Sequence, residues 1–162
     1  GLVGSQMCIR DRLVTADYLG IDPNQPFDPE SFVLSKRFDI LGTYEAYKKF
    51  HVEEDGIPKT EDLLWTIVST YTDWKVELTS SIDMELSVRE ANTKRGSGQK
   101  ETLPAGTHFV LLKTDGEAYA EAMLDDGRIC EFELEHPSED EWEGRINGVS
   151  ISDCFEYVPY AG

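Results

Sequence analysis

The sequence predicts a mostly β protein with a small barrel at the C-terminus, a preceding β-rich segment and at most one or two short helices. Apolar and ionised side chains alternate along several short runs, which is the period of a strand with one buried and one solvated face. Asx-Gly dipeptides punctuate the C-terminal third and supply the positive φ angles of tight hairpin turns. A hydrophobic fraction of 40% is large enough for a core, so we expect a folded chain.

The charge of the chain excludes several classes of partner. Its 162 residues include 32 acidic and 15 basic side chains, which gives a formal net charge of -17 at pH 7. Such a field repels nucleic acids and anionic lipid surfaces, so we expect neither as a partner. No apolar run reaches the roughly 18 residues of a membrane-spanning helix, so no membrane insertion is expected. The length fits one domain or two small ones.

The first twelve residues, 1–12, are predicted not to belong to the fold. Residues 3–12, VGSQMCIRDR, resemble the translation of a short-read sequencing adapter, so we interpret 1–12 as a non-native artefact. The alternative is a disordered tail with a start at Met7. Under the first interpretation Cys8 carries no information, and part of the gene upstream of Leu13 is expected to be missing.

The next stretch contains few clear periodicities. Residues 13–37 are rich in turn formers and hold three prolines at a spacing of three, which predicts a linker or a partly ordered segment. A short helix is predicted near 43–51, where two tyrosines and a histidine fall at helical spacing. A loop is predicted over 53–60, and the β-branched run at 63–71 favours a strand.

Strand-like alternation becomes regular in the second half of the β-rich segment, 38–100. Two alternating runs, 74–78 and 84–88, lie close enough together to predict a hairpin. The only basic cluster of the chain follows at 91–100, and its Gly-Ser-Gly tripeptide favours a flexible connection. Segment 38–100 is expected either to pack against the barrel or to supply strands to one continuous sheet.

The strongest pattern lies in 101–162, where the barrel is predicted. Strands are expected over 107–113, 118–124, 128–135 and 142–147, followed by one helical turn at 150–155 and a closing strand at 157–160. Asp115-Gly116, Asp126-Gly127 and Asn147-Gly148 mark the turns. Cys130 and Phe132 alternate with Glu131 and Glu133, which predicts a sheet with one wet face.

This order of strands, turns and one helical turn resembles an SH3-like small barrel. The segment 106–160 is similar to bacterial SH3-type modules at the C-termini of exported proteins, with Trp142, Gly144 and Val158-Pro159-Tyr160 loosely similar to their ligand-face residues. The tail from Thr107 to Gly162 more closely resembles the C-terminal module of uncharacterised proteins of gut Firmicutes. The resemblance implies a place at the end of a longer chain, outside the cytoplasm or in the cell envelope, and no assigned reaction.

The residues encode no recognisable catalytic, metal or cofactor site. Neither GxxxxGK[ST] nor GxGxxG occurs, and the three histidines, His51, His108 and His136, are scattered, so no cofactor and no metal are expected. Cys130 and Cys154 are flanked by acidic residues, which disfavours a reactive thiol. For these two cysteines a disulfide and two small buried side chains remain equally open.

The function predicted from the sequence is a non-catalytic accessory or ligand-binding module at the C-terminus of a larger, truncated bacterial protein. Its ligand would be a peptide, a glycan or a cell-envelope component, and the candidate binding residues are Trp142, Tyr119 and Tyr160, because aromatic rings stack on sugars and peptides. One alternative is a purely structural acidic spacer. Another is a hydrolase that uses carboxylates, which would require a pocket holding two acids with raised pKa values.

Overall fold

The computed structural model of the chain describes residues 28–68, 75–136 and 143–161. The fold is mostly β, as predicted, and its strands pair in antiparallel fashion. A ten-stranded sheet runs in the order β1-β2-β4-β8-β9-β10-β6-β7, with β3 added to β2 and β5 added to β8. A separate two-stranded sheet contains β11 and β12, and the helix that follows it, α2, has a single turn.

The bounds of the elements, in chain order, are β1 (Phe32–Phe38), β2 (Tyr44–Val52), β3 (Pro58–Lys59), β4 (Trp65–Val68), β5 (Glu77–Thr79), β6 (Met84–Arg89), β7 (Gln99–Leu103), β8 (His108–Thr114), β9 (Tyr119–Leu124), β10 (Ile129–Glu133), β11 (Arg145–Ile146), β12 (Val149–Ser150) and α2 (Ile151–Cys154).

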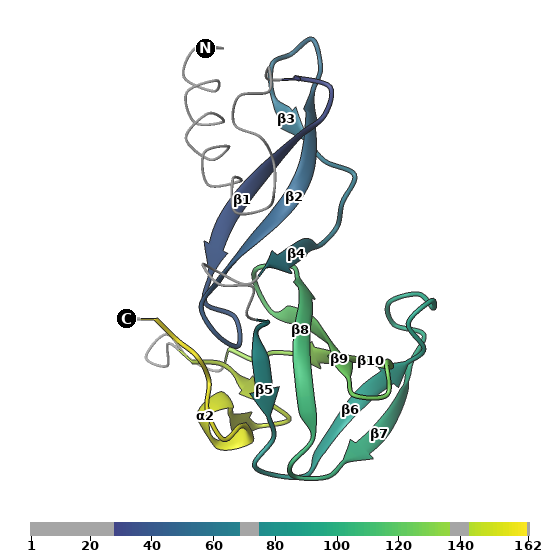
Figure 1. Ribbon diagram of the computed structural model, residues 1–162, viewed down its shortest axis with the longest axis vertical. Helices are drawn as coiled ribbons and strands as arrows, with labels where there is room; N and C mark the ends of the chain where they lie inside the picture. The colour runs from purple at the N-terminus through teal and green to yellow at the C-terminus, as the bar shows by residue number, and fades with distance from the viewer. Residues whose placement is uncertain (1–27, 69–74, 137–142, 162) are drawn as a thin grey trace.

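The β1–β2 hairpin projects from a more compact body that contains β5 to β10 (Figure 1). Strand β4 connects the two parts, because it pairs with β2 on one side and with β8 on the other. Strands β4, β5 and β6 of the predicted 38–100 segment all pair with strands of 101–162. The second of the two expectations for that segment therefore holds, since its strands belong to one continuous sheet.

The helix predicted near 43–51 is wrong, because these residues form β2. Seven residue pairs, from Phe32–Phe50 to Phe38–Tyr44, join β2 to β1, which lies mostly within the predicted 13–37 segment. The buried side chains of β2 are Tyr44 and Ala46, two positions apart, which is strand and not helix spacing. Tertiary pairing with β1 and β4 thus overrides a chance helical spacing of aromatic residues.

The hairpin predicted between 74–78 and 84–88 is also wrong. Strand β5 pairs with β8, whereas β6 pairs with β7 and β10. The chain is redirected at Ser80, whose N–H donates to Thr107 O (2.9 Å) and whose hydroxyl donates to Pro104 O (3.2 Å). Alternation shows which side chains of a strand are buried, but it does not choose the neighbouring strand.

Three of the strands and the helical turn predicted near the C-terminus are confirmed. Strands β8, β9 and β10 and the single turn of α2 lie where the sequence placed them. Of the strand expected at 142–147, residues 143–147 are described, and only Arg145–Ile146 form a strand. The closing strand at 157–160 is wrong, because no strand forms there. Phe155 instead makes a single antiparallel bridge with Ser80, and Pro159 O accepts a hydrogen bond from Thr43 N (3.0 Å).

The core of the body is built around three phenylalanines from different parts of the chain. Phe109 of β8, Phe132 of β10 and Phe155 after α2 meet edge to face, with ring centroids 5.2 to 6.1 Å apart. All three are almost completely buried. Edge-to-face packing adds to the hydrophobic effect and fixes the C-terminal segment against the sheet. In the part of the chain that the structure describes, no helix is long and apolar enough to cross a membrane.

Candidate functional site

A cluster of buried charged side chains lies on the outer face of the sheet, across β6, β10 and β9. Arg89, Glu121 and Glu131 are 9%, 7% and 7% exposed. The alternation along β10 correctly directs Glu131 away from the core, but the expectation of a wet face is wrong at this position. Buried charges are costly unless they are paired, so the contacts of this cluster determine what it does.

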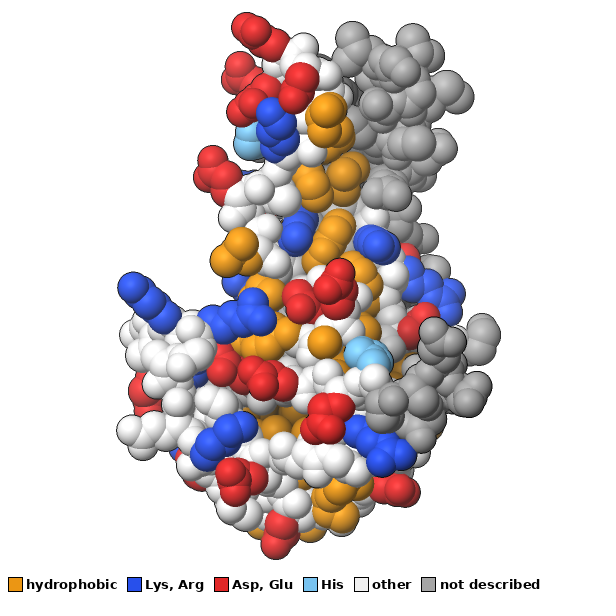
Figure 2. Space-filling model, turned by 180° about the vertical axis from the view of Figure 1, so that it is seen from behind, with side chains coloured by type: hydrophobic (Ala, Val, Ile, Leu, Met, Phe, Trp, Pro, Cys, Tyr) orange, Lys and Arg blue, Asp and Glu red, His pale blue; other side chains and the backbone are white. Residues whose placement is uncertain are grey.

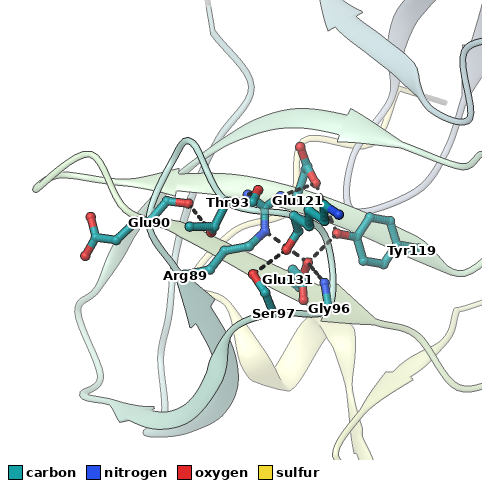
Figure 3. Close-up of polar contacts among 9 residues, drawn as sticks. Arg89, Glu90, Thr93, Gly96, Ser97, Tyr119, Glu121 and Glu131 are labelled. Carbon is teal, nitrogen blue, oxygen red and sulfur yellow. Dashed lines mark hydrogen bonds and ion pairs between the residues drawn. The ribbon is translucent and has the colours of Figure 1, made fainter.

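Arg89 neutralises both carboxylates (Figure 3). Its Nη2 donates to Glu121 Oε2 at 2.8 Å, and its Nε donates to Glu131 Oε1 at 3.1 Å. The remaining nitrogen, Nη1, donates to the backbone carbonyl oxygen of Thr93 at 3.1 Å. The guanidinium group therefore joins β6 to β9, to β10 and to the loop that follows β6.

That loop, residues 90–98 between β6 and β7, folds over the cluster. Gly96 N donates to Glu131 Oε1 at 3.0 Å, and the guanidinium carbon of Arg95 lies 3.6 Å from the centre of the Tyr119 ring. The Tyr119 hydroxyl lies 3.0 Å from both Glu121 Oε2 and Glu131 Oε1, and its single proton serves one of them at a time. The segment predicted as a flexible connection is thus a hairpin loop with defined contacts.

The electrostatics of the cluster favour the ionised form of the Glu131 carboxyl. Burial by itself would raise the pKa of the Glu131 carboxyl, but hydrogen bonds from Gly96 N, Tyr119 and Arg89 hold that pKa below its ordinary value. Burial and the neighbouring Glu121 raise the pKa of Tyr119. A carboxylate-dependent hydrolase needs an acid with a raised pKa, and Glu131 is shifted in the opposite direction. The cluster is suited to holding the loop in place.

An open groove of about 720 Å³ lies beside this loop. The residues that line it come from the end of β6, the loop, the start of β7 and the turn before β10: Val88, Arg89, Glu90, Asn92, Thr93, Lys94, Ser97, Gly98, Gln99, Lys100, Glu101 and Arg128. Most of these residues have polar or charged side chains, and Arg89 belongs to both the groove and the buried cluster. Loop, groove and cluster thus form one structural unit.

The groove is rich in cations for a chain with this net charge. The ammonium groups of Lys94 and Lys100 form no ion pair with any carboxylate that the structure describes. Arg128 donates to Glu101 at 2.8 Å and to Asp126 at 2.7 Å, so its charge is already paired. Figure 2 shows basic side chains projecting from the region of the β6–β7 loop. Among the described residues, therefore, no acid already occupies these two lysines, and they can meet an anionic group of a ligand.

Close backbone packing shapes the hairpin that carries the groove. A Cβ atom at Gly98 would lie 2.6 Å from Val88 O and 2.8 Å from Ser87 Oγ. No side chain fits at these distances, so glycine lets the start of β7 approach β6. The Gly-Ser-Gly tripeptide is therefore part of the folded hairpin, which is a role that its composition alone does not reveal.

Of the three predicted binding residues, the structure describes Tyr119 and Tyr160. Tyr119 is 4% exposed beneath Arg95, so its ring presents no open stacking face. Tyr160 is partly buried in the C-terminal segment, where burial, Glu143 and Asp39 raise its pKa to about 12. Trp142 lies outside the described residues. The basic cluster at 91–100 was the sequence signal for the groove, but its Gly and Ser content favoured a linker.

Cys130 and Cys154 are both free and buried. Burial raises the pKa of the Cys130 thiol to about 12 and that of Cys154 to about 11. The Cys154 Sγ lies 3.6 Å from the carbonyl oxygen of Val149. Both residues therefore occupy their positions as small buried side chains, which is one of the two interpretations left open by the sequence.

The histidines do not assemble a metal site. Within residues 28–68, 75–136 and 143–161, no group of three His, Cys, Asp or Glu side chains is placed to hold a metal ion. His108 instead bridges two acids, with Nδ1 2.7 Å from Asp125 Oδ1 and Nε2 3.1 Å from Glu77 Oε1. This bridge joins β5 to the β9–β10 turn and is a structural contact.

The groove, its two unpaired lysines and the buried cluster beneath the loop are the candidate site of this chain. Comparison of the chain with known protein families, with curated proteins and with solved structures found no match.

Proposed function

We propose that this chain is a non-catalytic ligand-binding module that serves as an accessory part of a larger bacterial protein. The observation that carries the proposal is the groove at the β6–β7 hairpin, where Lys94 and Lys100 lack acidic partners among the described residues. A volume of several hundred Å³ falls within the range of small-molecule binding sites. The cluster of Arg89 and Glu131 beneath the loop supports a preformed site, which reduces the entropy lost on binding.

The small body that carries the groove is in our proposal an SH3-like barrel. Its support is the strand order β8-β9-β10 followed by the single turn of α2. Ser80, at the end of β5, contacts both the β7–β8 turn and Phe155, which brings separate edges of the body together. The proposed ligand surface differs from the aromatic face expected from the sequence, because Tyr119 lies buried under the loop.

A binding screen with a groove variant tests the proposal. The full chain and its Lys94→Glu/Lys100→Glu variant would be compared on peptide arrays, on peptidoglycan fragments and on glycans, with circular dichroism to confirm that both are folded. We expect at least one class of ligand to bind the native chain and to be lost in the variant. Failure of all three sets, or a ligand that the variant retains, would overturn the groove as a binding site. A ligand lost in Tyr160→Ala instead would move the site to the C-terminal segment.

One alternative also has a specific observation in its favour. A net charge of -17 suits a structural spacer that keeps a larger protein dispersed by charge repulsion. Such a spacer requires the overall charge and not the two lysines. An empty binding screen, together with loss of solubility when exposed acids are neutralised, would favour the spacer over the binding module.

A further inference from the structure

Strand β7 is an edge of the ten-stranded sheet and lies beside the groove. Five residue pairs, from Met84–Leu103 to Val88–Gln99, join β7 to β6, and no strand in the described parts of the chain pairs with its other side. Four of its five residues are exposed. An open edge presents a row of backbone N–H and C=O groups that can pair with a further strand.

The same edge borders the unpaired cations. Lys100 lies within β7 and Lys94 in the loop that precedes it, and both line the groove. None of the residues that line the groove is aromatic, so it offers no surface for stacking a sugar ring. Backbone hydrogen-bonding groups together with ammonium groups favour a ligand that has both a peptide backbone and negative charge.

We propose that an extended acidic peptide segment of a partner protein adds to the free edge of β7 as an additional strand. This inference deepens the proposed function and rests on it. Alternate side chains of a strand point to the same face, so carboxylates at every second position of the segment face Lys94 and Lys100. Main-chain hydrogen bonds to β7 supply affinity, and the two lysines select an acidic sequence in a chain that otherwise repels acids.

The first experiment tests the charge selection. A fluorescein-labelled peptide with Glu at every second position, alternating with Val and Thr, is titrated with the full chain and followed by fluorescence polarisation. We expect this peptide to bind and its Lys-for-Glu counterpart not to bind. The Lys94→Glu/Lys100→Glu variant should bind about tenfold more weakly or worse, whereas the charge-matched Lys75→Glu/Lys113→Glu variant should stay within about twofold. Equal weakening in both variants would overturn the assignment to this groove.

The second experiment tests strand addition separately from charge. The same acidic peptide is N-methylated at its odd residues or at its even residues, so that only one set of amides remains able to donate. Successive amides of a strand point to opposite edges, so one methylated peptide should lose about tenfold in affinity and the other should bind like the parent. Hydrogen exchange at the amides of Gln99–Leu103 should slow in the complex. Unchanged affinity for both methylated peptides would overturn strand addition.

Two other occupants of the β7 edge, a second copy of the chain and an acidic glycan, would give different experimental results. A chain that is dimeric by light scattering, with its β7 amides already protected, would show that a second copy occupies the edge and would overturn the proposal. If polygalacturonate bound more tightly than the acidic peptide, the ligand would be an acidic glycan, and the proposal of a peptide strand would be overturned. In that case the proposed function would still stand, because a groove-dependent ligand would remain. Absence of every ligand would remove both.

Discussion

The guanidinium carbon of Arg95 lies 3.6 Å from the centre of the Tyr119 ring, in a stacked contact between the β6–β7 loop and β9. Tyr119 reaches beneath this contact to Glu121 and Glu131, which Arg89 neutralises. Two contacts therefore hold the loop against the sheet: the stacking of Arg95 on Tyr119 and the hydrogen bond from Gly96 N to Glu131.

Replacing Arg89 by Met should destabilise the fold by about 3 to 5 kcal/mol, because two buried carboxylates lose their cation. The measurement is urea-induced unfolding at pH 7. The matched control is the triple variant Arg89→Met/Glu121→Gln/Glu131→Gln, which removes the charges together and should recover most of the loss. A loss below about 1 kcal/mol in the single variant would show that the carboxylates are not buried as charged groups.

Alanine substitutions at Gly116 and Gly127 distinguish the cost of a steric clash from the cost of backbone strain. Both have a positive φ, but a Cβ at Gly116 would lie 2.5 Å from Phe38 Cε1, whereas a Cβ at Gly127 would meet nothing within 4 Å. Gly127→Ala should cost about 1 kcal/mol, and Gly116→Ala about 2 to 4 kcal/mol, because the second adds a clash with β1. Thermal or urea unfolding measures both. Equal losses would mean that Phe38 does not pack on the β8–β9 turn.

His108 gives the fold a pH dependence. The hydrogen bond to Asp125, followed by the charges of Asp125 and Glu77, raises the pKa of His108 above its ordinary 6.5. A raised folded-state pKa contributes stability that is fully present below pH 6.5 and is lost as the pH rises through the folded value. Native chain should therefore exceed His108→Gln in stability most at pH 5.5 and least at pH 9. A difference that does not change with pH would exclude this ion bridge.

The thiols of Cys130 and Cys154 should be inert in the folded chain. Only the thiolate is nucleophilic, and burial raises their pKa values to about 12 and 11. In a Cys8→Ser background, iodoacetamide should label neither residue at pH 7.5 and both residues in urea. Mass spectrometry supplies the control, since a native mass two daltons below that of the reduced chain would reveal a disulfide.

The sequence located the elements that depend on local chemistry. Asn147 and Gly148 both adopt a positive φ, as a tight Asx-Gly turn requires. Cys130 and Phe132 are buried on β10, as their alternation predicted. Helical spacing failed at Tyr44, because pairing with β1 decided the conformation of that stretch. Local patterns thus identified β6, β8, β9 and β10, but a helical spacing of aromatic residues was a misleading signal at β2.

The sequence by itself determined the tight turns and the buried face of each regular strand, because both depend on residues only a few positions apart. Strand partners were decided only in three dimensions: β5 lies beside β8 and β6 beside β10, since register along one strand contains no information about its neighbour. The same holds for the candidate site. Glu131 is buried, and Lys94 borders an open groove, because the β6–β7 loop lies over the outer face of the sheet. The sequence around Glu131 contains no sign of this loop, which lies more than thirty positions earlier in the chain.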